Sequence, residues 1–150
     1  AAKPSFRASF KRKRCLVLAD GFYEWKKQGV KMPVRFVLKS EVPFGFAGLW
    51  DVWKEPGGQE LQTFTIITTE ANDVVRPVHD RMPVILAPEH YAQWLDPAFI
   101  ELERLQPFLR PFPAESMKSH PVSPIVNNPR NDDPRCLLPW LPAQTELKLD

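Results

Sequence analysis

Short runs in which hydrophobic and polar residues alternate make up most of this chain, and turn-forming residues separate them. Alternation of this kind is typical of strands that bury one face. The pattern predicts strands over residues 15–19, 22–27, 32–38, 44–53, 61–68, 84–86 and 115–122. Asp20-Gly21 and Gln28-Gly29 are short turn signals between consecutive strands, so most strands are predicted to pair in antiparallel fashion.

A few short helices are predicted beside this sheet. They cover residues 5–13, 88–94 and 97–105, with one helical turn within 69–73. The first carries Phe6 and Phe10 on one face, and the other two begin with a proline, which is favoured at the first helical position. The predicted fold class is therefore α+β, a mainly antiparallel, barrel-like β-sheet with short peripheral helices. We expect one domain over residues 1–150, with a core at about 3–140 and a tail at 143–150.

Composition and charge narrow the possible partners. The chain has 150 residues, of which 43% are hydrophobic and 11% aromatic, as in a folded globular protein. It contains no apolar stretch of membrane-spanning length and nothing resembling a secretory signal, so we expect a cytoplasmic protein, nucleoid-associated if bacterial.

Residues 1–39 hold 11 Lys/Arg and 2 Asp/Glu, whereas residues 40–150 hold 9 and 16. The basic first quarter fits a polyanion such as nucleic acid, although residues 11–14 alone also fit a solvated helix face.

The sequence offers no pattern for a metal or a nucleotide cofactor. Cys15 and Cys136 are too few for a disulfide scaffold, and Cys15 lies in an apolar run that predicts a buried, inert thiol. Neither a cluster of metal-ligating residues nor a glycine-rich phosphate-binding loop occurs in the sequence. We therefore expect no metal, no organic cofactor, no membrane partner and a monomeric protein.

Two groups suited to proton transfer lie next to predicted strands. Glu24 stands between Tyr23 and Trp25, and His79 precedes Asp80. Apolar surroundings raise the pKa of a carboxyl toward neutrality, as a general acid or base requires, and a neighbouring carboxylate holds a histidine in one tautomer. Both are candidate catalytic residues. The alternatives are a salt-bridged strand glutamate and a structural histidine bonded to a backbone carbonyl.

Several motifs occur together in one order. They are Phe6-Arg-Ala-Ser-Phe10, Ala19-Asp-Gly-Phe-Tyr-Glu-Trp25, Gly45-Phe-Ala-Gly-Leu-Trp50, Thr65-Ile-Ile-Thr-Thr69, His79-Asp-Arg-Met-Pro-Val-Ile-Leu86 and Val122-Ser-Pro followed by Val126-Asn-Asn128. Over roughly residues 3–140 this set closely resembles the SOS response-associated peptidase (SRAP) family. In that family a cysteine directly after the initiator methionine closes a thiazolidine with the ring-opened aldehyde of an abasic site in single-stranded DNA. The same residues remove the initiator methionine by self-cleavage.

The resemblance implies roles for Glu24 and His79, and it also implies a reactive cysteine that this sequence lacks. Glu24 would shuttle protons during ring closure and self-cleavage, and His79 would protonate the sugar oxygen so that the abasic site opens. The reactive cysteine is not in this sequence, which begins Ala1-Ala-Lys-Pro-Ser5. The chain is either a fragment of a longer protein or a degenerate copy, and the retention of both residues favours the fragment.

Candidate DNA-binding residues follow the same strands. They are Arg81, Thr68, Thr69 and Asn72. The guanidinium fork of Arg81 suits phosphate oxygens, but it also suits pairing with Asp80 or Glu24. The other three either donate to phosphate or cap the following helical turn. Trp25, Trp50 and Trp53 either stack on bases or, as is more common within strands, belong to the core.

The resemblance therefore implies a DNA-damage-response protein whose partner is single-stranded DNA, especially with abasic sites. It would crosslink through a cysteine outside this chain and process its own N-terminus, while the 150 residues alone would bind DNA weakly and form no crosslink. Two alternatives stay open: a non-covalent nucleic-acid-binding module, and a cysteine-type protease acting on other proteins.

Overall fold

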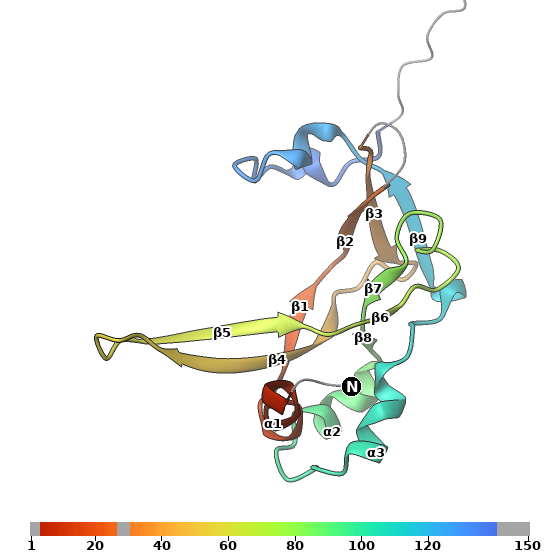
Figure 1. Ribbon diagram of the computed structural model, residues 1–150. Helices are drawn as coiled ribbons and strands as arrows, with labels where there is room; N and C mark the ends of the chain where they lie inside the picture. The colour runs from red at the N-terminus through yellow and green to blue at the C-terminus, as the bar shows by residue number, and fades with distance from the viewer. Residues whose placement is uncertain (1–3, 27–30, 141–150) are drawn as a thin grey trace, which may run out of the picture.

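The computed structural model describes residues 4–26 and 31–140 of the chain (Figure 1). The strands are β1 (Arg14–Ala19), β2 (Phe22–Trp25), β3 (Pro33–Leu38), β4 (Phe44–Lys54), β5 (Glu60–Ile66), β6 (Thr68–Glu70), β7 (Arg81–Pro83), β8 (Ile85–Leu86) and β9 (Met117–Pro121). The α-helices are α1 (Pro4–Arg12), α2 (Tyr91–Leu95) and α3 (Leu102–Leu105). The 3₁₀ turns are η1 (Pro88–His90), η2 (Gln106–Leu109), η3 (Ala114–Ser116), η4 (Pro124–Asn127) and η5 (Pro134–Cys136). The predicted α+β class is confirmed.

The strands pair in antiparallel fashion, as the turn signals predicted. One sheet has the order β1-β4-β5 with β8 also on β4, a second has the order β2-β3-β9, and the third is the pair β6-β7. Among the described residues these sheets do not join into a closed barrel. The barrel-like closure suggested by the number of strands is therefore absent from this part of the chain.

A junction of three backbone hydrogen bonds divides the sheets. The N–H of Ala47 donates to the carbonyl of Val84, that of Val84 to Ile67, and that of Ile67 to Ala47, each over 2.9 Å. Beyond this point β5 no longer pairs with β4, and β8 takes its place. The segment predicted as one strand over 61–68 is therefore two strands in two sheets. β7, which is not among the strands that the sequence predicted, pairs with the second of them.

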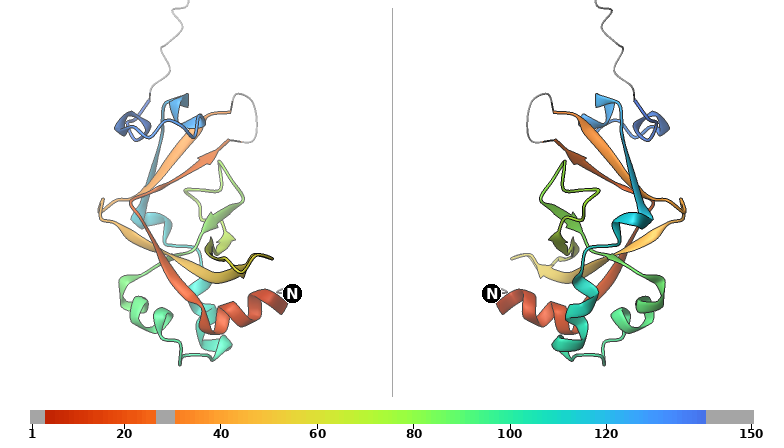
Figure 2. Two further views of the ribbon diagram at one scale, coloured as in Figure 1. Left: turned by 90° about the vertical axis from the view of Figure 1, so that its left-hand side faces the viewer. Right: turned by 90° about the vertical axis from the view of Figure 1, so that its right-hand side faces the viewer.

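The helices gather at one end of the molecule, opposite the sheet β2–β3–β9 and the last turns of the chain (Figures 1 and 2). α1 and the helix predicted over 88–94 are confirmed within a residue or two, the latter as η1 followed by α2. The helix predicted over 97–105 is wrong for its first half. There the Asp96 side chain accepts from the N–H of Ala98 (2.8 Å), and the Asp96 carbonyl accepts from the N–H of Phe99 (3.1 Å). These bonds form a tight turn, so α3 begins only at Leu102.

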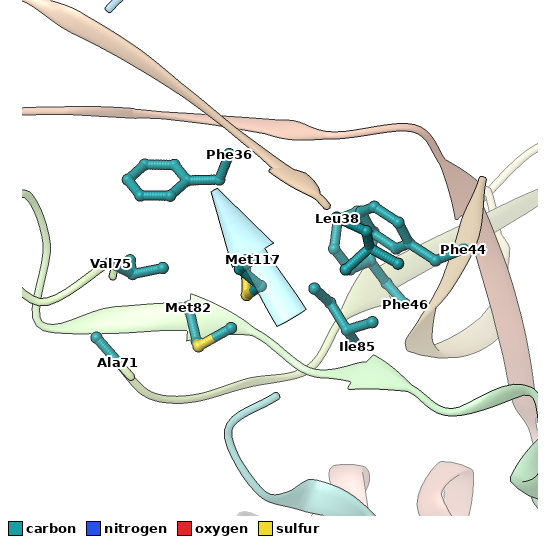
Figure 3. Packing of buried hydrophobic residues seen from close by; sticks show 9 residues of the cluster. All are labelled: Phe36, Leu38, Phe44, Phe46, Ala71, Val75, Met82, Ile85 and Met117. Atoms are coloured by element: carbon teal, nitrogen blue, oxygen red, sulfur yellow. The ribbon is translucent and has the colours of Figure 1, made fainter. Parts of the chain in front are cut away.

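Two apolar clusters hold these elements together. Core cluster one lies between the sheets and comprises Phe36, Leu38, Phe44, Phe46, Ala71, Val75, Met82, Ile85 and Met117 (Figure 3). Core cluster two lies between the sheet β1–β4–β5 and the helices and comprises Ala47, Leu49, Val84, Leu86, Trp94 and Leu105. Since β4 contributes alternate residues to each, it is buried on both faces over its first half.

Some expectations fall on parts of the chain that the structure does not describe. The hairpin turn at Gln28-Gly29 and the tail at 143–150 lie outside the described residues. Of the helices that are described, none has the length and apolar character needed to cross a membrane.

Candidate active site

Glu24 lies on β2, at the edge of the sheet β2–β3–β9. Because side chains alternate between the two faces of a strand, Glu24 shares its face with Phe22, whereas Tyr23 and Trp25 point to the opposite face. Glu24 pairs in register with Val34 on β3, and both Phe22 and Val34 pack against core cluster one. The expectation that Tyr23 and Trp25 surround the carboxylate is therefore wrong. Its apolar neighbours are those at the edge of the core.

The last turns of the chain hold the opposite face of β2. The Tyr23 hydroxyl donates to the carbonyl of Cys136 (3.1 Å), and the indole N–H of Trp25 donates to the Asn127 side-chain oxygen (2.6 Å). Burial raises the pKa of Tyr23, against an opposing effect of Arg35, so its hydroxyl remains a donor at neutral pH. Cys136 thus holds β2 on one side of Glu24 and Asn127 holds it on the other.

His79 follows a helical turn and precedes β7. Its backbone N–H donates to the carbonyl of Val75 (3.0 Å). Its ring Nδ1 lies 3.1 Å from the backbone nitrogen of Arg81, 3.0 Å from the Arg81 carbonyl oxygen and 3.4 Å from a carboxylate oxygen of Asp80. Without a proton, Nδ1 accepts from the N–H; with one, it donates to the carbonyl or pairs with Asp80. Nδ1 of His79 thus has a partner whether or not it carries a proton. The arrangement therefore fits both a catalytic and a structural role for His79.

Core cluster one connects the segments that carry Glu24 and His79. Phe22 and Val34, the neighbours of Glu24 on its sheet face, pack against it, and so does Val78, which directly precedes His79. The connection between β6 and β7 accordingly lies beside the sheet β2–β3–β9 (Figures 1 and 2). Two segments far apart in the sequence thus border one cluster. That the two side chains meet across a cleft stays a prediction.

Arg81 and Thr68 are joined within the pair β6–β7. One terminal nitrogen of the guanidinium donates to the backbone carbonyl (2.6 Å) and the hydroxyl (3.0 Å) of Thr68. Both residues are exposed, and Thr69, on the neighbouring position of β6, is half-buried. The guanidinium is therefore oriented by β6 and lies at the exposed surface of the pair β6–β7.

Asn72 is used within the fold. It is only 7% exposed, and its amide nitrogen donates to the carbonyl of Phe112 (2.7 Å). Its side-chain oxygen accepts from the N–H groups of Val74 and Val75, each over 3.1 Å. These contacts match the capping role that the sequence analysis left open. They leave the side chain no open position at the surface for a phosphate.

The tryptophans of β4 lie outside the core. Trp50 is 38% exposed and Trp53 is 53% exposed, so the interpretation of these residues as core residues is wrong. They follow Leu49, the last residue of β4 that pairs with β1, and from there on β4 pairs only with β5 among the described strands. Trp25, by contrast, is half-buried and held by Asn127.

Arg14 is a structural residue that sequence reasoning missed. It was counted in a basic run, but it is 6% exposed, and its guanidinium donates to five backbone carbonyls, those of Phe10, Lys11, Trp94, Asp96 and Phe99. A signal existed: Arg14 stands two positions before Leu16, so strand alternation places it on the buried face. In the same run Arg12 is exposed, and Lys13 pairs with Asp51 (2.6 Å).

The two thiols lie in different elements and differ in environment. Cys15 is half-buried on β1, and Cys136 is buried in η5. Burial raises the pKa of the Cys15 thiol, so less thiolate is present at neutral pH than for a free cysteine. In the part of the chain that is described, no three His, Cys, Asp or Glu side chains are grouped to hold a metal ion.

Alkylation of Cys15 is expected to be slow. At pH 8 its reaction with iodoacetamide should run about tenfold slower than that of free cysteine and speed up as the pH rises, because the thiolate is the nucleophile. Peptide-resolved mass spectrometry measures Cys15 and Cys136 separately in one sample. Alkylation of Cys15 as fast as free cysteine would contradict its assignment as an inert thiol.

Comparison with known proteins shows which family this chain resembles in sequence. The family model for SOS response associated peptidase (SRAP) matches residues 1–129. The abasic site processing protein YoqW of Bacillus subtilis is 45% identical over 137 residues, which cover 90% of this chain and 61% of that protein. The abasic site processing protein HMCES of Gallus gallus is 39% identical, over 92% of this chain and 47% of its own length.

A solved structure agrees with these sequence relatives. The crystal structure of a protein from Bacteroides thetaiotaomicron superposes with a TM-score of 0.85 at 33% identity, over 93% of this chain and 62% of that chain. This chain thus spans less than two thirds of the relatives that it matches. Since the family model and the curated relatives both cover most of its residues, the chain belongs to the SOS response associated peptidase (SRAP) family.

Proposed function

We propose that this chain is part of an abasic-site-processing protein of single-stranded DNA. The observation that carries the proposal is that the segments carrying Glu24 and His79 border one core cluster, through Phe22, Val34 and Val78, in a chain whose relatives are named abasic site processing proteins. The nucleophile is an N-terminal cysteine in a part of the protein outside these 150 residues. Cys15 and Cys136 do not take that role, because their backbone nitrogens are in peptide bonds and the ring closure needs a free α-amine beside the thiol.

The proposed reaction joins one amine and one thiol to one aldehyde. His79 donates a proton to the ring oxygen of the abasic sugar, which opens to the aldehyde. The α-amine of the cysteine condenses with the aldehyde and loses one water, and its sulfur then adds to the imine carbon while the nitrogen takes a proton. Glu24 carries the protons between these steps. No electron is transferred, so the thiazolidine forms without an oxidant.

The same groups support self-processing. Glu24 would polarise the water or amine that acts when the initiator methionine is released. This hydrolase or peptidase activity is confined to the protein's own N-terminus in the proposal. Steady turnover of an unrelated peptide by the longer protein would show instead that it acts on other proteins.

The direct test uses an abasic single-stranded oligonucleotide. The longer protein should leave a protein–DNA species that survives a denaturing gel, whereas the 150-residue chain should leave none. If the longer protein shows only reversible, salt-sensitive binding, the non-covalent module is the correct function. A stable adduct with the 150-residue chain would make Cys15 or Cys136 the nucleophile and overturn the assignment.

Arg81 is proposed to hold a phosphate next to the lesion, oriented by its bonds to Thr68. Changing Arg81 to Gln should lower the slope of log affinity against log salt concentration by about 1, because one phosphate contact is lost. Fluorescence anisotropy with a single-stranded oligonucleotide at several salt concentrations measures that slope. Arg104→Gln is the matched control, since Arg104 lies on α3 and pairs with Glu101 (3.3 Å). Equal slopes for Arg81→Gln and the unchanged protein would contradict the phosphate contact.

A further inference from the structure

The outer half of the hairpin β4–β5 presents large apolar side chains to solvent. Trp50 is paired with Phe64 and Trp53 with Leu61. Their exposed fractions are 38%, 64%, 53% and 55% in that order. Figure 1 shows the hairpin extending away from the rest of the described chain. Trp50 and Phe64 lie on one face of the hairpin, and Trp53 and Leu61 lie on the opposite face, because positions three apart on a strand point to opposite sides. Neighbouring exposed apolar side chains of this size, as in the pair Trp50–Phe64, mark a surface that another piece of protein covers.

One face of the hairpin continues the core. Because side chains alternate along a strand, Trp50 lies on the same face of β4 as Phe46, and Phe64 on the same face of β5 as Ile66. Phe46 belongs to core cluster one, and Ile66 packs against it. The Trp50–Phe64 face is therefore a direct extension of core cluster one. The ammonium of Lys13 lies 5.4 Å from the centroid of the Trp50 ring, and both Trp50 and Phe64 remain exposed.

The edge of β5 is open as well. Among the described strands β5 pairs only with β4. The N–H of Ile67 donates to the carbonyl of Ala47 on β4. Since N–H groups alternate in direction along an antiparallel strand, those of Gln62 and Phe64 point to the open edge.

The open edge also lacks protection. Glu60, at the start of β5, is its one charged residue and pairs with Lys54 (2.8 Å). Residues 61–69 contain no charged residue, proline or glycine, which are the devices that natural edge strands use against further pairing. An edge of this kind accepts an added strand.

The relatives indicate what covers this surface. The chain spans 61% of YoqW and 62% of the Bacteroides protein, whose shared part has the same fold. Each therefore has an additional part without a counterpart here. We propose that the hairpin β4–β5 is the docking surface for this additional part of the SRAP fold. It adds a strand to the open edge of β5 and covers Trp50 and Phe64, and so extends core cluster one.

This docking would also bring the additional part toward the candidate active site. Core cluster one is the cluster against which Phe22 and Val34 pack on the face of Glu24. A segment that extends the cluster at Trp50 and Phe64 therefore borders the same apolar layer. The proposal rests on family membership and on the exposed hairpin, and it does not depend on the proposed crosslinking chemistry.

The test supplies the additional part as a separate polypeptide. The region of Bacillus subtilis YoqW that this chain does not match is purified and mixed with the 150-residue chain. Light scattering should show a one-to-one complex, and hydrogen exchange should show the amides of Gln62 and Phe64 protected at least about tenfold. Binding weaker than about 100 µM, or a complex without this protection, would overturn the proposal.

Two variants locate the interface. Gln62→Pro removes an N–H at the open edge and keeps the bonds to β4, so it should weaken binding about tenfold. Phe64→Ser removes apolar contact area and should weaken binding by about tenfold or more, and it carries the test if the proline variant does not fold. Leu18→Ser is the control, because Leu18 is 76% exposed on β1, away from β5.

Two other outcomes count against the proposal. Equal weakening by Leu18→Ser would reveal non-specific apolar capture. A dimer of the 150-residue chain with protected β5 amides would identify a second copy as the occupant. None of these measurements involves DNA, so a complex that forms without restoring crosslinking would refute the proposed function and leave the docking surface in place.

Discussion

Arg14→Met is expected to lower the free energy of unfolding by about 3–5 kcal/mol. The guanidinium is 6% exposed and donates to carbonyls at the end of α1, at Trp94 on α2 and in the turn after it. Without it, several buried carbonyls lose their donor, and each unsatisfied one costs about 1–3 kcal/mol. Urea unfolding followed by circular dichroism measures the change.

The control and the conservative variant separate charge from geometry. Arg12→Met alters the exposed neighbour and should shift stability by less than about 0.5 kcal/mol. Arg14→Lys keeps a positive charge but offers only three donors from one point, so it should recover little of the loss. Burial lowers the pKa of Arg14 and nearby Asp96 partly opposes this, yet the group stays charged at neutral pH. A loss below about 1 kcal/mol for Arg14→Met would contradict the structural role assigned to this residue.

Glu24→Gln in the longer protein is expected to slow crosslinking to an abasic oligonucleotide about 100-fold. The amide keeps the shape and the position on β2 but cannot accept or release a proton at the steps between imine and thiazolidine. Single-turnover reactions stopped over time and resolved on denaturing gels give the rate. Removal of the initiator methionine, followed by mass spectrometry, should slow in the same variant.

Two further variants test whether this effect belongs to the site. Glu41→Gln changes an exposed glutamate that pairs with Lys118 on β9, and it should leave both rates unchanged. His79→Gln combined with Glu24→Gln should cost less than the product of the two single changes if both residues act in the same proton transfer. Unchanged rates for Glu24→Gln would remove Glu24 from the mechanism.

Local patterns were sufficient for most of the secondary structure. The strands β1 to β4 and the helices α1 and α2 lie close to their predicted positions, because alternation, turn residues and proline starts act over only a few neighbours. The segments predicted over 61–68 and 97–105 differ for a tertiary reason. The backbone of Ile67 bonds to Ala47 on β4 and to Val84, and the carbonyl of Asp96 accepts from Arg14. These partners lie far away in the sequence, so the local pattern does not predict them.

In the candidate site, too, local sequence predicts some features and only tertiary contacts decide the others. The motifs around Glu24 and His79 identified the residues, since their chemical types can be recognised without coordinates. Which neighbours surround them depended on strand pairing: Tyr23 and Trp25 are adjacent in sequence yet face the last turns of the chain, not Glu24. Asn72 likewise has the right type for a phosphate contact, but its bond to Phe112 uses its amide inside the fold.

By itself, the sequence determined the fold class, the family resemblance and the pair of candidate proton-transfer residues, because residue type and short-range periodicity carry that information. Only the tertiary structure decided that Arg14 is buried, that the hairpin tryptophans are exposed and that the segments of Glu24 and His79 border one cluster. These features depend on contacts between residues far apart in the chain. A residue's burial depends on what packs over it, and no local pattern specifies that partner.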